Sequence, residues 1–144
     1  MRFRHIAVGI LTLVLAIAAG PWLLYWYALG QLDGLPQAPR YHASAAEIQG
    51  VWNRAHGAGK PTMHPISPYD YVGALFAGVE KSRRPEWNII GHVAARHNTV
   101  HLPTTGLWGH LSGAATEIWI SRSWTAEQIF SQAVEDARRG AVQE

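Results

Sequence analysis

Two acidic residues of this chain lie in apolar surroundings, where a carboxylate can serve acid–base chemistry. Glu80 follows the mostly apolar run 71–79, and Glu117 lies within another apolar segment. Partial burial raises the pKa of a carboxyl group, which suits it to act as a general acid or base. Each residue also has a structural alternative, because Glu80 stands four residues before Arg84 and can form a surface ion pair, while Glu117 can face solvent. Glu80 and Glu117 are the candidate catalytic residues.

A short stretch of small and hydroxyl-bearing residues, 112–116, is a candidate binding surface. Ser112 and Thr116 offer hydroxyl groups, and the small residues between them allow close approach of a ligand. Trp108 lies just before this stretch and could stack against a sugar ring. The alternatives are tight helix packing for the small residues and a place in the core for the tryptophan. The candidate substrate-binding residues are Ser112, Thr116 and Trp108.

Histidines are concentrated in the second half of the chain, and two of them have the spacing of a metal site. His97 and His101 are four residues apart, which places two side chains on one helical face. A third ligand is needed, and Pro103 indicates that the helix ends close by, so we expect hydrogen-bonded histidines and no metal. The chain has no cysteine, which excludes thiolate catalysis and cysteine-bound metals. No cofactor is expected.

An uncharged segment near the N-terminus determines where the rest of the chain lies relative to a membrane. Residues 6–29 carry no charge and would span about 36 Å as a helix, enough to cross a hydrocarbon core of about 30 Å. Arg2 and Arg4 precede the segment and Asp33 is the first charge after it, so the positive-inside rule predicts a cytoplasmic N-terminus. We expect a single-pass inner-membrane protein with a periplasmic domain. Aromatic residues typical of the membrane–water interface follow at the far end: Trp22, Tyr25, Trp26 and Tyr27.

A cleaved signal peptide is the alternative interpretation of this segment. Residues 6–15 can form its apolar core, and the sequence Ala16-Ile17-Ala18 fits a cleavage site. Against this reading, Pro21 lies close to the cut and the apolar run continues through Leu29. Both interpretations export the domain.

The remaining residues predict a small helical domain. Residues 30–43 are rich in glycine and proline, so we expect an irregular linker between the bilayer and the domain. Apolar residues at helical spacing predict four or five helices within residues 44–139, followed by a polar tail, 140–144. The predicted fold is therefore mainly α, with a transmembrane anchor in residues 1–29 and a small bundle after it. Three helix-start signals support it: Ser44 with Glu47, Ser67 before Pro68, and Thr125 with Gln128.

The charge balance argues against one class of partner. The chain has 12 Lys+Arg and 10 Asp+Glu, a net charge of +2, and no run of basic residues. Nucleic-acid binding is therefore not expected.

The order of these features resembles that of the monofunctional peptidoglycan glycosyltransferases, in which a membrane helix precedes a helical, lysozyme-like domain. The stretches 66–68 (ISP) and 73–80 (GALFAGVE) are similar to the family's approach to its catalytic glutamate, and 112–116 lies about where the family binds its donor substrate. The resemblance implies a catalytic role for Glu80. Departures are Lys81, where the family has an acid, and the end of the chain before a second catalytic glutamate. The resemblance therefore implies a shortened relative without polymerase activity.

Together these observations predict an envelope protein that binds and does not catalyse. Expected partners are the lipid bilayer and a glycan or lipid-linked precursor of peptidoglycan assembly. If the domain is active, it acts as a glycosyltransferase of this kind. The alternative is an accessory or structural subunit of a membrane protein complex, in which exposed tryptophans contact a protein partner.

Overall fold

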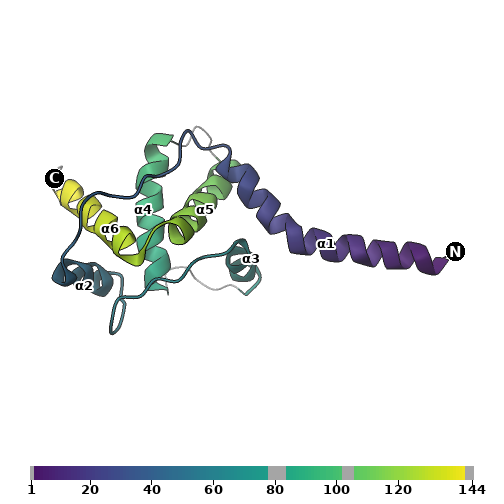
Figure 1. Cartoon of the computed structure of the whole chain (residues 1–144), viewed down its shortest axis with the longest axis horizontal. Helices are drawn as coiled ribbons and strands as arrows, with labels where there is room; N and C mark the ends of the chain where they lie inside the picture. The colour runs from purple at the N-terminus through teal and green to yellow at the C-terminus, as the bar shows by residue number, and fades with distance from the viewer. Residues whose placement is uncertain (1, 78–83, 102–105, 142–144) are drawn as a thin grey trace.

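The computed structural model describes residues 2–77, 84–101 and 106–141. In this part of the chain the secondary structure consists of six helices and no strands, and a long N-terminal helix precedes a small bundle (Figure 1). The predicted fold class is therefore confirmed. The helices are α1 (Arg2–Leu29), α2 (Ala45–Arg54), α3 (Pro68–Ala77), α4 (Pro85–His101), α5 (Gly106–Ser123) and α6 (Ala126–Ala141).

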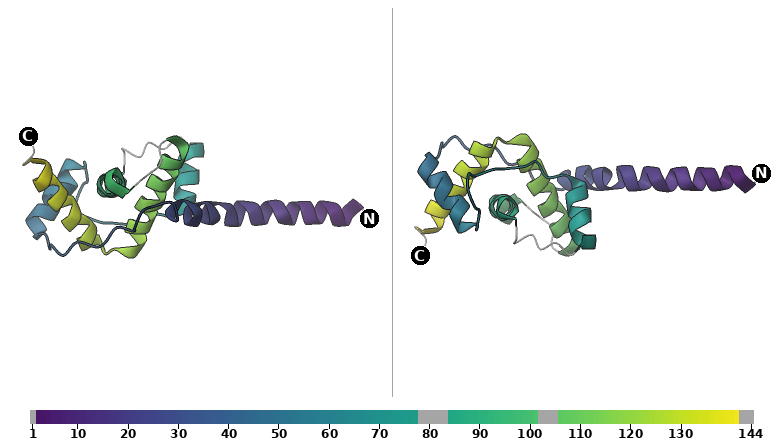
Figure 2. Two further views of the ribbon diagram at one scale, coloured as in Figure 1. Left: turned by 90° about the horizontal axis from the view of Figure 1, so that it is seen from above. Right: turned by 90° about the horizontal axis from the view of Figure 1, so that it is seen from below.

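Helix α1 extends away from the rest of the molecule (Figures 1 and 2). Its segment Arg4–Leu29 is long and apolar enough to cross a membrane. Large apolar side chains along it are exposed, such as Leu13, which is 61% exposed, and Ile17, which is 63% exposed. In water this surface would be unfavourable, so its composition fits a lipid environment.

The last turns of α1 are part of the core of the domain. Tyr25, Ala28 and Leu29 are buried, and α1 packs on α5 and α3. The hydroxyl group of Ser112 on α5 donates a hydrogen bond of 3.3 Å to the backbone carbonyl of Ala28. The end of α1 and the helices that follow it therefore share one core.

An irregular connector joins the end of α1 to the start of α2. It folds back along the bundle, where the backbone N–H of Asp33 donates to the carbonyl of His101 at 3.1 Å. The ring Nε2 of His97 donates to the carbonyl of Gly34, also at 3.1 Å. These bonds give the connector's polar backbone groups partners, which allows it to lie against the protein.

The predicted helix starts are confirmed by their caps. At α2 the Ser44 N–H donates to the Glu47 carboxylate at 2.8 Å, and the Glu47 N–H donates to the Ser44 hydroxyl at 3.4 Å, which is a capping box. Thr125 and Gln128 form the equivalent pair before α6, at 2.8 and 3.2 Å. Before α3, the Ser67 N–H donates to the Asp70 carboxylate at 2.6 Å.

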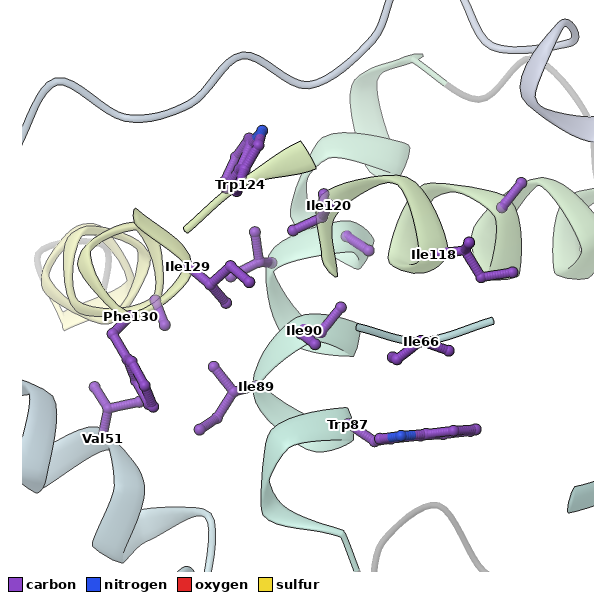
Figure 3. Close-up of a cluster of buried hydrophobic side chains, with 14 of the residues drawn as sticks. Val51, Ile66, Trp87, Ile89, Ile90, Ile118, Ile120, Trp124, Ile129 and Phe130 are labelled. Atoms are coloured by element: carbon purple, nitrogen blue, oxygen red, sulfur yellow. The ribbon is translucent and has the colours of Figure 1, made fainter. Parts of the chain in front are cut away.

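Helix α4 lies in the middle of the bundle and packs on both α5 and α6 (Figure 3). Ile90 of α4 and Ile120 of α5 are fully buried. The loop between α2 and α3 contributes Ile66 to the core. The backbone N–H of Ile66 donates a hydrogen bond to the Ser121 hydroxyl at 2.9 Å. Other core side chains labelled in Figure 3 are Val51, Trp87, Ile89, Ile118, Trp124, Ile129 and Phe130.

Candidate functional site at the junction of α1, α3 and α5

Glu117 lies on α5 and is half-buried. Its carboxylate faces Gly91 of α4, where an added Cβ would lie 3.7 Å from Oε1. The hydroxyl group of Tyr71 on α3 donates a hydrogen bond to Glu117 Oε2. The partly buried carboxylate therefore lies where α3, α4 and α5 meet.

The ring of Tyr71 is held in place by a second contact. It stacks on Trp87 of α4, with ring centres 5.1 Å apart and planes 29° apart. The guanidinium carbon of Arg84 lies 5.2 Å from the centre of the Trp87 ring, in cation–π geometry. Burial, together with the negative charge of Glu117, raises the pKa of the Tyr71 hydroxyl. Tyr71 thus stays protonated at physiological pH and remains a hydrogen-bond donor.

An apolar pocket of about 120 Å³ lies between α1, α3 and α5. Tyr71 forms part of its wall, whereas Glu117, the acceptor of the Tyr71 hydrogen bond, is not one of its lining residues. Leu75 also lines the pocket and is 83% exposed, so the pocket opens on that side. Its walls are apolar and can hold part of an apolar chain. Its remaining lining residues are Pro21, Leu24, Tyr25, Ala28, Pro68, Val72, Leu111, Ala114, Ala115 and Ile118.

Ser112 and Thr116, predicted as substrate-binding residues, are 1% and 0% exposed. Ser112 bonds to Ala28, as described above. Thr116 Oγ1 lies 2.9 Å from both Asn98 Oδ1 and the Ser112 carbonyl, and its single proton is donated to one of them. Both hydroxyl groups take part in helix contacts, and a substrate would reach them only if these helices separated. Their role in binding stays a prediction.

Trp108, the third predicted binding residue, lies near the start of α5 and is 47% exposed. Its ring packs edge-on against Tyr27 of α1, with centres 5.5 Å apart. Trp108 is therefore accessible, but it lies beside the end of α1 and does not line the apolar pocket.

Glu80, the other predicted catalytic residue, lies outside the described residues, as does Lys81. Glu117 is linked to the apolar pocket only through its hydrogen bond with Tyr71, which lines the pocket.

The rings of His97 and His101 stack in α4, with centres 4.3 Å apart. Burial lowers the pKa of His97, and the nearby His101 acts in the same direction, although the hydrogen bond to the Gly34 carbonyl opposes it. Within the described ranges no three His, Asp or Glu side chains come together in a way that could hold a metal ion.

A second, more polar pocket of about 340 Å³ lies between α4 and α6. Asp136 in its wall is 3% exposed and accepts a hydrogen bond from Gln132 at 3.0 Å. Its other carboxylate oxygen has no hydrogen-bond partner in the described part of the chain. This pocket has no lining residue from α1, which distinguishes it from the apolar pocket.

Sequence reasoning missed Tyr71, which it treated only as a member of an apolar run. A tyrosine on the apolar face of a helix needs a hydrogen-bond partner when it is buried, and that need was the available signal. Its partner is 46 residues away in the sequence, so no local spacing could identify Glu117 as the acceptor.

Comparisons with protein families, with curated proteins and with solved structures found no match to this chain.

Proposed function

We propose that this protein is a single-pass protein of the bacterial inner membrane whose periplasmic helical domain binds a lipid-linked glycan precursor. The proposal is carried by the apolar pocket that the membrane helix shares with α3 and α5. A lipid tail that leaves the bilayer beside α1 can enter this pocket without crossing water. The polar head group would then lie outside the pocket, on the side where Leu75 is exposed.

Charge placement supports the proposed orientation. Arg2 and Arg4 precede the apolar segment, and Asp33 follows it. By the positive-inside rule the domain faces the periplasm, where lipid-linked precursors of the cell wall are used.

Binding is proposed in preference to catalysis because Glu117 is engaged. Its carboxylate accepts the Tyr71 hydrogen bond and faces the α4 backbone at Gly91. A general acid or base has to reach a proton on the substrate, and this arrangement instead holds three helices together.

The test uses the full chain in detergent and native mass spectrometry, with undecaprenyl-pyrophosphate-linked disaccharide pentapeptide as the probe. Ala114 lines the pocket and is half-exposed, so Ala114→Leu fills the pocket without entering the core. We expect one probe molecule per chain, bound at least about tenfold more weakly by Ala114→Leu. Ala126→Leu, the same change on the exposed start of α6, is the control and binds like wild type. Absence of binding, or equal binding by Ala114→Leu, overturns the proposal.

The alternative function is that of an accessory subunit of a membrane protein complex. It is favoured by exposed apolar side chains outside the membrane helix, such as Val100, 77% exposed, and Leu107, 71% exposed. Affinity purification of the full chain from solubilised membranes separates the two functions. A stoichiometric protein partner, together with no binding of the lipid-linked probe, would favour the subunit.

A further inference from the structure

Helix α3 contacts α1 well before the end of the apolar segment. The hydroxyl group of Tyr69 on α3 donates a hydrogen bond to the backbone carbonyl of Ala18 on α1. Ala18 precedes Leu29, the last residue of α1, by 11 residues, which is about 16 Å along a helix. Helix α3 is thus beside the membrane helix and not above its end.

The depth of this contact in a bilayer follows from the position of Ala18 along α1. A hydrocarbon core of about 30 Å needs about 20 helical residues, so a span that begins at Ile6 ends near Tyr25. Ala18 then lies about 10 Å inside the core. A tyrosine side chain that reaches this carbonyl from α3 places the start of α3 near the boundary between acyl chains and head groups.

The direction of α3 also fits this boundary. Helix α3 lies at the end of the domain from which α1 leaves, and it runs across the direction of α1 (Figures 1 and 2). If α1 crosses the bilayer, α3 lies roughly in the plane of its surface. Amphipathic helices bound to membranes lie in this way, with their apolar face about 5–10 Å deep.

The free surface of α3 is apolar and aromatic. Phe76 is 88% exposed and Leu75 is 83% exposed, although both are large hydrophobic residues. Phe76 follows Tyr69 by seven residues, so the two side chains lie on the same side of α3. Tyr69 contacts α1 there, and Phe76 remains exposed. Asp70 is the one charged residue of α3, and it lies about 100° around the helix from Tyr69, where it caps the start of the helix with Ser67.

We propose that α3 is an interfacial helix that inserts Phe76 and Leu75 into the outer leaflet of the bilayer that α1 spans. The occupant of this apolar face is the lipid surface, because the face is continuous with the exposed apolar surface of α1 through the contact between Tyr69 and Ala18. The inference rests on the membrane anchoring proposed above and not on the bound ligand. It gives the apolar pocket an opening that faces lipid, since Leu75 belongs to both surfaces.

The test uses site-directed spin labelling, because the chain has no cysteine to remove. The full chain carries one label, at Phe76→Cys, and is reconstituted into vesicles of phosphatidylethanolamine and phosphatidylglycerol. Collision with oxygen, which concentrates in lipid, is compared with collision with a water-soluble nickel chelate. Leu23→Cys on the exposed side of α1 is the lipid reference, and Ala46→Cys on α2 is the water reference.

We expect the label at 76 to resemble the label at 23, with an oxygen-to-nickel collision ratio several-fold higher than that at 46. A water-like label at 76 beside a lipid-like label at 23 overturns the inference and leaves the anchor intact. A water-like label at 23 shows instead that the anchoring proposal fails, and the inference fails with it. Spin–spin broadening at 76 that disappears on dilution with unlabelled chain indicates a second copy on this face and also overturns the inference. Because Phe76 is almost fully exposed, an unchanged circular dichroism spectrum is expected for Phe76→Cys.

Discussion

The Tyr71 hydroxyl donates a hydrogen bond to the Glu117 carboxylate, and this bond joins α3 to α5. The same tyrosine ring stacks on Trp87 of α4, so one side chain links three helices. Pro68 is the buried residue of α3 and Tyr71 is partly buried, so the position of α3 depends strongly on the Tyr71 side chain.

Tyr71→Phe tests the contribution of this hydrogen bond. The phenylalanine ring can keep the stack on Trp87, while the carboxylate loses a donor. We expect the free energy of unfolding to fall by about 1.5–3 kcal/mol, as for other hydrogen bonds to a charged group. Urea unfolding of the full chain in detergent, followed by circular dichroism, measures it. Tyr27→Phe on the exposed part of α1 is the control, with an expected change below about 0.5 kcal/mol. Equal stability of both variants would contradict a structural role for the bond.

Local signals made much of this fold predictable. Ser44 and Thr125 each cap a helix by hydrogen bonding to a residue three positions later in the sequence. Both predicted helix starts are confirmed. Such signals need only a few neighbouring residues, so the sequence alone contains them. The apolar segment 6–29 likewise predicted one long helix, which is present as α1.

Contacts between distant segments were not predictable in the same way. An apolar helix looks the same in sequence whether it faces lipid or protein, so the burial of Tyr25 and Leu29 in the domain was not foreseen. The hydroxyl groups of Ser112 and Thr116 likewise fit a ligand or a neighbouring helix equally well, and in the structure they lie beside Ala28 of α1 and Asn98 of α4. Tertiary packing decides these questions, and one sequence does not reveal it.

The loop before α3 is attached to the bundle at one point that can be tested. The buried Ile66 N–H donates to the Ser121 hydroxyl at 2.9 Å, and Ser121→Ala leaves this N–H without that partner. We expect the free energy of unfolding to fall by about 1–3 kcal/mol, the desolvation cost of a buried unpaired group. Ser123→Ala, two residues later on the exposed end of α5, should change it by less than about 0.5 kcal/mol. Thermal melts of the two variants compare them, and an equal effect would contradict the anchoring role of Ser121.

Two glycines of the α2 region should respond in opposite directions to alanine. A Cβ at Gly57 would overlap the indole ring of Trp52, so Gly57→Ala should lower the free energy of unfolding by about 1–3 kcal/mol. A Cβ at Gly50 would meet only the flexible Arg54 side chain at 3.6 Å. Gly50→Ala should raise the free energy of unfolding by about 0.5–1 kcal/mol, because glycine is unfavourable inside a helix. Urea unfolding reports both changes. A stabilised Gly57→Ala would show that Trp52 can move away.

Glu47 should make stability depend on pH in the acid range. Hydrogen bonds from Ser44, and from Tyr41 at 3.0 Å, lower the pKa of its carboxyl group from 4.5 to about 2, and the ion pair with Arg138 acts in the same direction. Between these two values the unfolded chain binds more protons than the folded chain, so protonation favours unfolding. The stabilisation is therefore complete above pH 4.5 and is lost as the pH falls towards about 2.

Glu47→Gln isolates this effect, because glutamine can still accept the Ser44 N–H bond of the capping box but carries no charge. Its melting temperature should be below that of wild type at pH 6, and the difference should shrink as the pH falls from 5 towards 2, measured by thermal melts in steps of pH. Glu127→Gln is the matched control: Glu127 is exposed and contacts His42 at 3.1 Å. Its melting curve should follow that of wild type through this range. A difference between wild type and Glu47→Gln that stays constant with pH would show that the carboxylate charge does not supply the stabilisation, and that the cap geometry alone holds the start of α2.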